Sequence, residues 1–88
     1  MITARQSRAA RALLGWTQET LADKARISLT ALKRLESESG LDVYETTRDQ
    51  ARRALESAGI VFLSTDRGHG VLLVDDHGKK PNRSTASR

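Results

Sequence analysis

The chain of 88 residues contains no cysteine, which excludes disulfide bridges and thiolate metal sites. Its three aromatic residues, Trp16, Tyr44 and Phe62, are too few for a surface that stacks single-stranded bases. It has no apolar run long enough to cross a bilayer and no signal-peptide pattern, so we expect a cytoplasmic or nucleoid-associated protein without a membrane partner. A net charge of +4 and a pI of about 10.1 are compatible with nucleic-acid binding but do not establish it.

Two short helical patterns, separated by a few residues, occupy positions 17–36. Thr17 is a typical N-cap, and Trp16 and Leu21 have the spacing of a hydrophobic staple around it. This predicts a helix from Gln18 to about Ala25. The same cap and staple spacing recurs at residues 27–32, which predicts a second helix over residues 28–38.

The second helix would bury Ala31, Leu32 and Leu35 and leave four other side chains outward: Leu29, Thr30, Lys33 and Arg34. An outward arginine can bond guanine in bidentate fashion, a lysine can reach guanine or phosphate, and leucine or threonine can touch a thymine methyl group. This stripe therefore suits the base edges of duplex DNA. An ordinary solvated basic face is the alternative, and the helix pattern alone does not distinguish the two.

Catalytic and metal-binding signals are weak or missing. The sequence has no glycine-rich phosphate loop that opens a helix, no zinc-protease spacing and no nucleophile beside an oriented base, so we expect no catalytic residues and no cofactor. His69 and the cluster Asp75-Asp76-His77 are a poor metal signal, and we expect no metal site.

One further helix is predicted on each side of this pair. Thr3 and Gln6 have capping-box spacing and open a helix that Gly15 ends, with its inward positions at Ala9, Ala10, Leu13 and Leu14. Asp42 and Glu45 repeat that spacing and predict a helix over residues 43–58. Its expected buried stripe comprises Tyr44, Thr47, Ala51, Ala54, Leu55 and Ala58, and its arginines are expected on a solvated surface.

Residues 60–63 and 71–74 are apolar and rich in β-branched side chains, and the glycines within residues 65–70 can turn between them. We predict a β-hairpin over residues 60–74. Because both strands are apolar at consecutive positions, both faces of the hairpin require cover. One face can pack on the helices, and the other predicts a homodimer interface drawn from Ile60, Val61, Phe62, Leu63, Val71, Leu72, Leu73 and Val74. A hairpin buried wholly within one domain is the alternative.

The domain is expected to end near residue 75. Residues 76–88 are polar and basic, with glycine, proline and several serines, and are predicted to form a flexible tail. The length of the remainder suits one small domain with a modest core.

Residues 11–36 resemble the Cro- and lambda-repressor-like family of helix-turn-helix regulators, often called XRE-type. The resemblance lies in Arg11, Leu14-Gly15-Trp16-Thr17-Gln18-Glu19, Leu21-Ala22, Ala25, Ile27-Ser28, Leu32 and Leu35-Glu36. It implies a mainly α bundle of four helices, here followed by a β-hairpin, and a transcriptional regulator of double-stranded DNA. Together with the homodimer predicted from the hairpin, it leads us to expect a dimeric repressor or autoregulator that binds a palindromic operator through the helix over residues 28–38.

Particular residue roles follow from the resemblance. It places Leu29, Thr30, Lys33 and Arg34 at base-reading positions, and Arg11 and Glu36 in a structural ion pair. Expected phosphate contacts are Thr17, Gln18, Arg26, Ser28 and Ser37. An exposed ion pair would contribute only roughly 0–1 kcal/mol.

The chain departs from the family at two positions. Arg26 stands where the family usually has glycine, and a left-handed backbone there would cost roughly 1 kcal/mol. Glu38 follows the second helix, where basic residues are usual, and would repel phosphate. This acidic position keeps open an alternative function as a protein-interaction module, such as an antitoxin or antiactivator with a protein partner.

Overall fold

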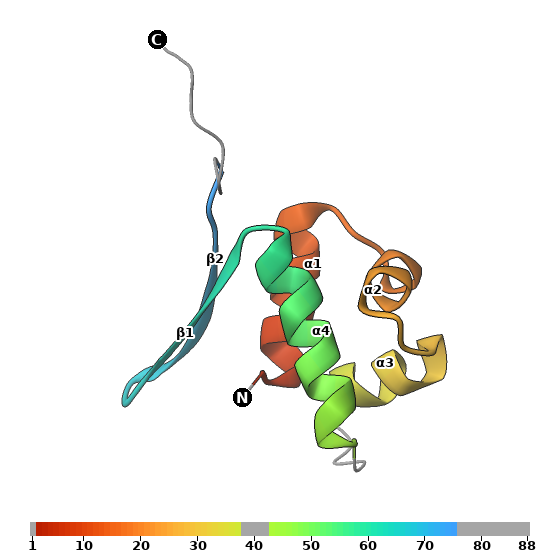
Figure 1. The fold of residues 1–88 in the computed structure, drawn as a ribbon. Coiled ribbons are helices and arrows are strands. Elements are labelled where there is room, and N and C mark those ends of the chain that lie inside the picture. Colours follow the sequence, from red (N-terminus) through yellow and green to blue (C-terminus); the bar gives the residue numbers. More distant parts are fainter. Residues whose placement is uncertain (1, 38–42, 76–88) are drawn as a thin grey trace, which may run out of the picture.

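The computed structural model describes residues 2–37 and 43–75, which form four helices followed by one hairpin (Figure 1). The elements in chain order are α1 (Ala4–Leu14), α2 (Gln18–Ala25), α3 (Leu29–Glu36), α4 (Glu45–Ser57), β1 (Ile60–Thr65) and β2 (Gly68–Leu73). The predicted fold class is confirmed: the protein is mainly helical, with an antiparallel pair of strands at the end of the described chain.

The first three helices begin where side-chain caps predict. The Thr3 hydroxyl accepts from the Gln6 amide at 3.1 Å, and the Gln6 carboxamide accepts in return from the Thr3 amide at 3.0 Å. Thr17 and Ser28 cap α2 and α3 in the same way, by accepting from the backbone amide three residues on. Gly15 ends α1 in a left-handed conformation, with φ of 71°. Each of these bonds satisfies an amide that the helix leaves without a partner.

Two predicted helix boundaries are wrong. Helix α3 ends at Glu36 because Ser37 is extended, at φ −81° and ψ 142°, so it stops short of residue 38. Helix α4 begins at Glu45, and its N-cap is Tyr44, whose side chain makes no capping bond. The capping box predicted from Asp42 and Glu45 cannot be followed further, because Asp42 lies outside the described residues.

The core lies where the four helices meet. Leu21, Leu32 and Leu55 are fully buried and come from α2, α3 and α4, and Ile2 and Ile60 close the core from the two ends of the bundle. Burying these side chains is the main source of stability, at about 25 cal/mol per Å² of apolar surface.

Three positions predicted to be buried are exposed instead. In α1, Leu13 and Ala9 lie at the surface because the helix turns Gln6, Ser7 and Ala10 inward, so that its buried face is centred on two polar side chains. Tyr44 is 83% exposed, because it precedes α4 and does not share the buried face of that helix.

The hairpin has a tighter turn than predicted. Its strands pair from Ile60↔Leu73 to Thr65↔Gly68, which leaves only Asp66 and Arg67 in the turn. The Thr65 hydroxyl accepts from the Arg67 amide at 3.1 Å, and Gly68 has a φ of 155° that favours glycine. The strands therefore extend into the segment 65–70 that was expected to form a loop.

The two faces of the hairpin have different surroundings, since directly paired residues share a face. The inner face carries Ile60, which is buried in the core, with Phe62, Val71 and Leu73 packed against it. The prediction that all eight apolar residues are available to a dimer interface is therefore wrong for this inner set. On the outer face Val61, Leu63 and Leu72 remain 42–52% exposed.

Helices α1 and α4 lie between the hairpin and the pair α2–α3 (Figure 1). The hairpin contacts α1 mainly through β2 and contacts α4 through β1. The hairpin and α3 are therefore separated by α1 and α4 (Figure 1). None of the helices in the described ranges has the length and apolar character needed to span a membrane.

Candidate nucleic-acid interface

The outer face of α3 presents the cationic stripe that the sequence predicts. Thr30, Lys33 and Arg34 are exposed, whereas Leu29 is half-buried. No carboxylate within residues 2–37 and 43–75 forms an ion pair with Lys33 or Arg34. Their charges are therefore open to a partner in solution. The arginines of α4 differ in this respect, because Arg52 pairs with Asp49 and Glu56 of its own helix.

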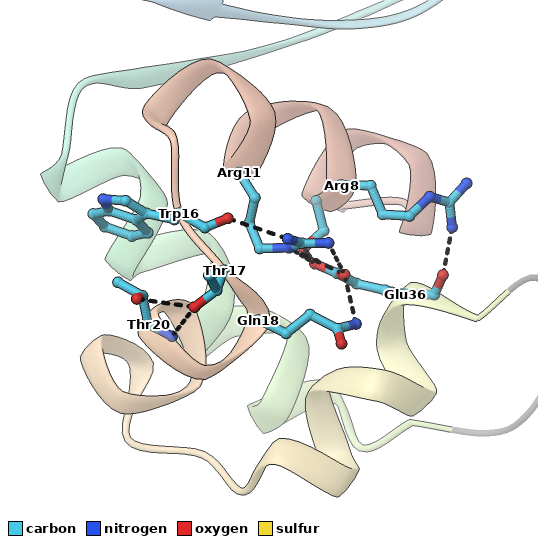
Figure 2. Close-up of polar contacts among 8 residues, drawn as sticks. Arg8, Arg11, Trp16, Thr17, Gln18, Thr20 and Glu36 are labelled. Carbon is cyan, nitrogen blue, oxygen red and sulfur yellow. Dashed lines mark hydrogen bonds and ion pairs between the residues drawn. The ribbon is translucent and has the colours of Figure 1, made fainter.

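The C-terminal end of α3 is anchored by Glu36, whose side chain is buried under α1 (Figure 2). The Arg11 guanidinium donates to both carboxylate oxygens, with Nη2 to Oε1 at 2.8 Å and Nε to Oε2 at 2.9 Å. The Ser7 hydroxyl adds a bond of 2.6 Å, and the Gln18 carboxamide adds one of 3.1 Å. Donors from α1 and α2 thus converge on one carboxylate at the end of α3.

This convergence decides the charge state of Glu36. Burial favours the neutral acid and by itself raises the pKa of the carboxyl group. The hydrogen bonds from Arg11, Ser7 and Gln18, together with the positive charge of Arg11, act in the opposite direction and leave the pKa below its ordinary value. Glu36 is therefore ionised at neutral pH. The predicted Arg11–Glu36 pair is present, and its carboxylate is buried rather than exposed.

The arginines of α1 make two more contacts, both to backbone carbonyls. The Arg8 guanidinium donates to the backbone carbonyl of Glu36, one of the carbonyls that have no partner within the helix (Figure 2). Arg11 also donates to the Trp16 carbonyl at 3.2 Å, which ties the start of α2 to the same cluster. The orientation of α3 relative to α1 and α2 is therefore set by directional polar contacts.

The predicted phosphate-binding residues occupy the starts and turns around α3. Thr17 and Ser28 are exposed N-caps whose hydroxyls already accept a backbone hydrogen bond. Gln18 gives one amide hydrogen to Glu36, and the carboxamide carries two such donors. Ser37 is half-buried at the end of α3. Glu38, the acidic departure from the family pattern, lies outside the described residues.

Arg26 adopts the left-handed backbone that its position in the turn requires. Its φ is 60° and its ψ is 44°, and its amide donates to carbonyls in the last turn of α2. A side chain in this conformation costs about 1–2 kcal/mol relative to glycine. The side chain itself is exposed and adds a positive charge between α2 and α3.

Two functional features could not be recognised from the sequence. Ser7 is fully buried and contacts Glu36, yet a single serine within a helical pattern carries no signal for such a contact. Gln6 was predicted only as a capping residue, but its side-chain nitrogen Nε2 also donates to the backbone carbonyls of Leu63 and Gly70, at 3.0 and 2.9 Å. One side chain thus joins α1 to both strands of the hairpin.

Comparison with known families agrees with this geometry. Residues 8–42 match the family model described as Helix-turn-helix, a match that runs from α1 through α3 and covers less than half of the chain. The predicted resemblance to the XRE-type family is thereby confirmed for residues 8–42. The match supports a DNA-binding helix-turn-helix regulator, a class of proteins that are not typically enzymes.

No curated protein and no solved structure matches the chain. Among the residues that the structure describes, no three histidine, aspartate or glutamate side chains gather in a way that could hold a metal ion. Asp76 and His77 of the weak metal signal lie outside that part of the chain.

Proposed function

We propose that this protein is a sequence-specific regulator of transcription that binds double-stranded DNA by inserting α3 into the major groove. The observation that carries the proposal is the combination of exposed Thr30, Lys33 and Arg34 with a buried Glu36 at the end of the same helix. Side chains that read bases need a rigid support, because misplacement by about 1 Å weakens directional hydrogen bonds. The Glu36 cluster supplies that support.

Base reading is assigned to the exposed stripe. Arg34 suits a bidentate contact with the O6 and N7 atoms of guanine, and Thr30 suits the methyl group of thymine. Lys33 can reach guanine or the neighbouring phosphate. Leu29 is half-buried and contributes apolar contact at the edge of the stripe. Around it, the exposed Thr17, Arg26 and Ser28, with Gln18 and Ser37, would hold the phosphate backbone and fix the register of the helix on the duplex.

The proposed active form is a homodimer through the outer face of the hairpin. Val61, Leu63 and Leu72 leave an apolar surface there, and a two-stranded hairpin is marginal without cover. Because α1 and α4 separate the hairpin from α3, two copies can join through the outer face of the hairpin without covering either α3 helix (Figure 1). A two-fold dimer would read a palindromic operator with half-sites about 34–36 Å apart, or a multiple of that. Covering a promoter needs no further domain, so repression of its own operon is the proposed mode.

Footprinting on the DNA upstream of the protein's own coding sequence tests the DNA-binding proposal. The wild-type protein should protect a symmetric site. The double variant Lys33→Glu/Arg34→Glu should lose that protection, because two cations of the reading stripe become anions. The matched control Arg52→Glu/Arg53→Glu changes the net charge equally on α4 and should retain protection. Equal loss in both variants would indicate a nonspecific effect of charge.

The same experiment separates DNA binding from the protein-interaction alternative. If the wild-type protein protects no site and the α3 variant still binds its protein partner, the DNA-binding proposal is wrong.

Analytical ultracentrifugation tests the dimer. The wild-type protein should sediment as a dimer at high micromolar concentration, and Leu63→Ser/Leu72→Ser should sediment as a monomer. Leu13→Ser removes an exposed leucine from α1 and serves as the control for general loss of surface hydrophobicity. A wild-type monomer at this concentration would exclude the hairpin dimer.

A further inference from the structure

Tyr44 is the most exposed large hydrophobic side chain in the described part of the protein. It is 83% exposed, against 42–52% for the other exposed large hydrophobic residues. Burial of its ring therefore contributes little to the stability of the fold. It also occupies the N-cap of α4, a position that favours serine, threonine, aspartate or asparagine, and it makes no capping bond. Residues that break local rules without a structural benefit are expected at functional sites.

The surroundings of Tyr44 connect it to α3. A groove of about 530 Å³ lies between the two helices, with Thr30, Ala31 and Arg34 on the α3 side and Tyr44 and Thr47 on the α4 side. Thr30 and Arg34 are four residues apart and therefore lie on one face of α3. Tyr44 thus borders the same opening as Thr30 and Arg34, two of the proposed base-reading residues.

The backbone at this position is fixed although the side chain is exposed. The Tyr44 carbonyl accepts from the amides of Thr47 and Arg48, at 3.0 and 3.2 Å, as the first turn of α4 requires. Rigid aromatic side chains with a polar tip make contacts at low entropic cost, which is why tyrosine is common at interfaces. The backbone that carries the ring is therefore fixed beside α3 before any partner binds.

We propose that Tyr44 is a DNA-backbone contact. Its hydroxyl donates a hydrogen bond to a phosphodiester oxygen on the strand that flanks the base read by Arg34. This inference rests on the proposed function and extends the interface from α3 to the start of α4. Duplex DNA is the occupant that the groove favours, because it continues the exposed cationic surface of α3 and because phosphate accepts from a tyrosine hydroxyl. A backbone contact also explains why the residue stands beside α3 rather than on it.

Fluorescence anisotropy with two labelled duplexes tests the inference. One duplex carries the protected upstream site, and the other is a scrambled sequence of the same length. The variant Tyr44→Phe removes only the hydroxyl and should weaken binding to both duplexes by a similar factor of about tenfold, as expected for a hydrogen bond to a charged group. Because the phenol is neutral, the salt dependence of binding should not change.

Two other variants provide the comparison. Arg34→Ala should reduce the preference for the protected duplex over the scrambled one, since a base contact is lost. Thr46→Val removes an exposed hydroxyl one position inside α4, where the side chain does not line the groove, and should bind as the wild type does. All three variants should melt at the wild-type temperature, because none of these side chains is buried.

The outcomes are distinguishable. Wild-type affinity of Tyr44→Phe for both duplexes would overturn the inference while leaving the proposed function intact, provided that Arg34→Ala loses its preference. Weakened binding to the protected duplex alone would also overturn it, because the hydroxyl would then read a base. If the wild-type protein binds neither duplex, the proposed function fails together with this inference.

Discussion

Helix α1 makes two long-range contacts of different chemical character. At its junction with α3, Ser7 and Arg11 surround the ionised carboxylate of Glu36. At its junction with the hairpin, the neutral carboxamide of Gln6 bridges two backbone carbonyls beside apolar packing. The first contact is directional and charged, so it fixes the angle of α3. The second is uncharged and combines two hydrogen bonds from one side chain with apolar packing.

The difference corresponds to two different requirements. A helix that reads bases must keep its side chains in register, and a buried carboxylate with several donors from α1 and α2 holds it there. In the proposed dimer the hairpin has to present an apolar face, and uncharged contacts are sufficient to hold it against α1. The comparison yields four expectations, from the largest effect to the smallest.

Removing the carboxylate should have the largest effect on stability. Glu36→Ala leaves Arg11 without its partner and the buried Ser7 hydroxyl without an acceptor, so we expect a loss of about 3 kcal/mol in the free energy of unfolding. Glu56→Ala is the matched control, because Glu56 pairs with Arg52 at the surface and should cost roughly 0–1 kcal/mol. Urea denaturation measures both, and a Glu36→Ala curve identical to the wild type would contradict the structural role.

The hairpin junction should be weaker than the α3 junction. Gln6→Ala removes the bridge to Leu63 and Gly70 and half of the capping box, and we expect a loss of about 2 kcal/mol. Gln50→Ala, at an exposed site on α4, should change the stability little. If Gln6→Ala costs no more than Gln50→Ala in the same urea titration, the bridge does not stabilise the hairpin.

Acid should weaken the junction between α1 and α3 and leave the junction between α1 and the hairpin unchanged. The pKa of Glu36 is lower in the folded protein than its ordinary value of 4.5, so ionised Glu36 stabilises the fold fully above that pH. This part of the stability is lost as the pH falls through the folded pKa. The wild type should therefore lose more stability than Glu36→Gln between pH 7 and pH 3, whereas Gln6→Ala should follow the wild-type dependence. Parallel curves for wild type and Glu36→Gln would refute this assignment.

The turn between α2 and α3 should show the smallest effect, of opposite sign. Arg26→Gly relieves a left-handed backbone and should raise the free energy of unfolding by roughly 0.5–1 kcal/mol, after allowing for the greater freedom of glycine in the unfolded chain. Gln50→Gly, in the regular helix α4, should instead lower it by about 1 kcal/mol. Thermal melting of both variants checks the sign. A destabilised Arg26→Gly protein would mean that the arginine side chain contributes more than its backbone costs.

Sequence reasoning was most accurate where the deciding interactions are local. The caps at Thr3, Thr17 and Ser28 each bond an amide three residues away, so a short window of sequence contains both partners. The start of α4 was placed too early because Asp42 and Glu45 have capping-box spacing, whereas α4 begins at Glu45. Tyr44 was predicted to be buried because a tyrosine at helical spacing resembles a core residue. Its exposure depends on where α4 begins relative to α3.

The sequence by itself determined the four helices, the hairpin and the cationic stripe of α3, because hydrophobic periodicity and capping bonds involve residues close together in the chain. Only the tertiary structure decided which strand face is covered, what surrounds Glu36 and where Gln6 donates. Ser7 and Glu36 are 29 residues apart, and Gln6 and Gly70 are 64 apart. Contacts over such separations form only when the helices pack, and packing is set by the shape of the whole core.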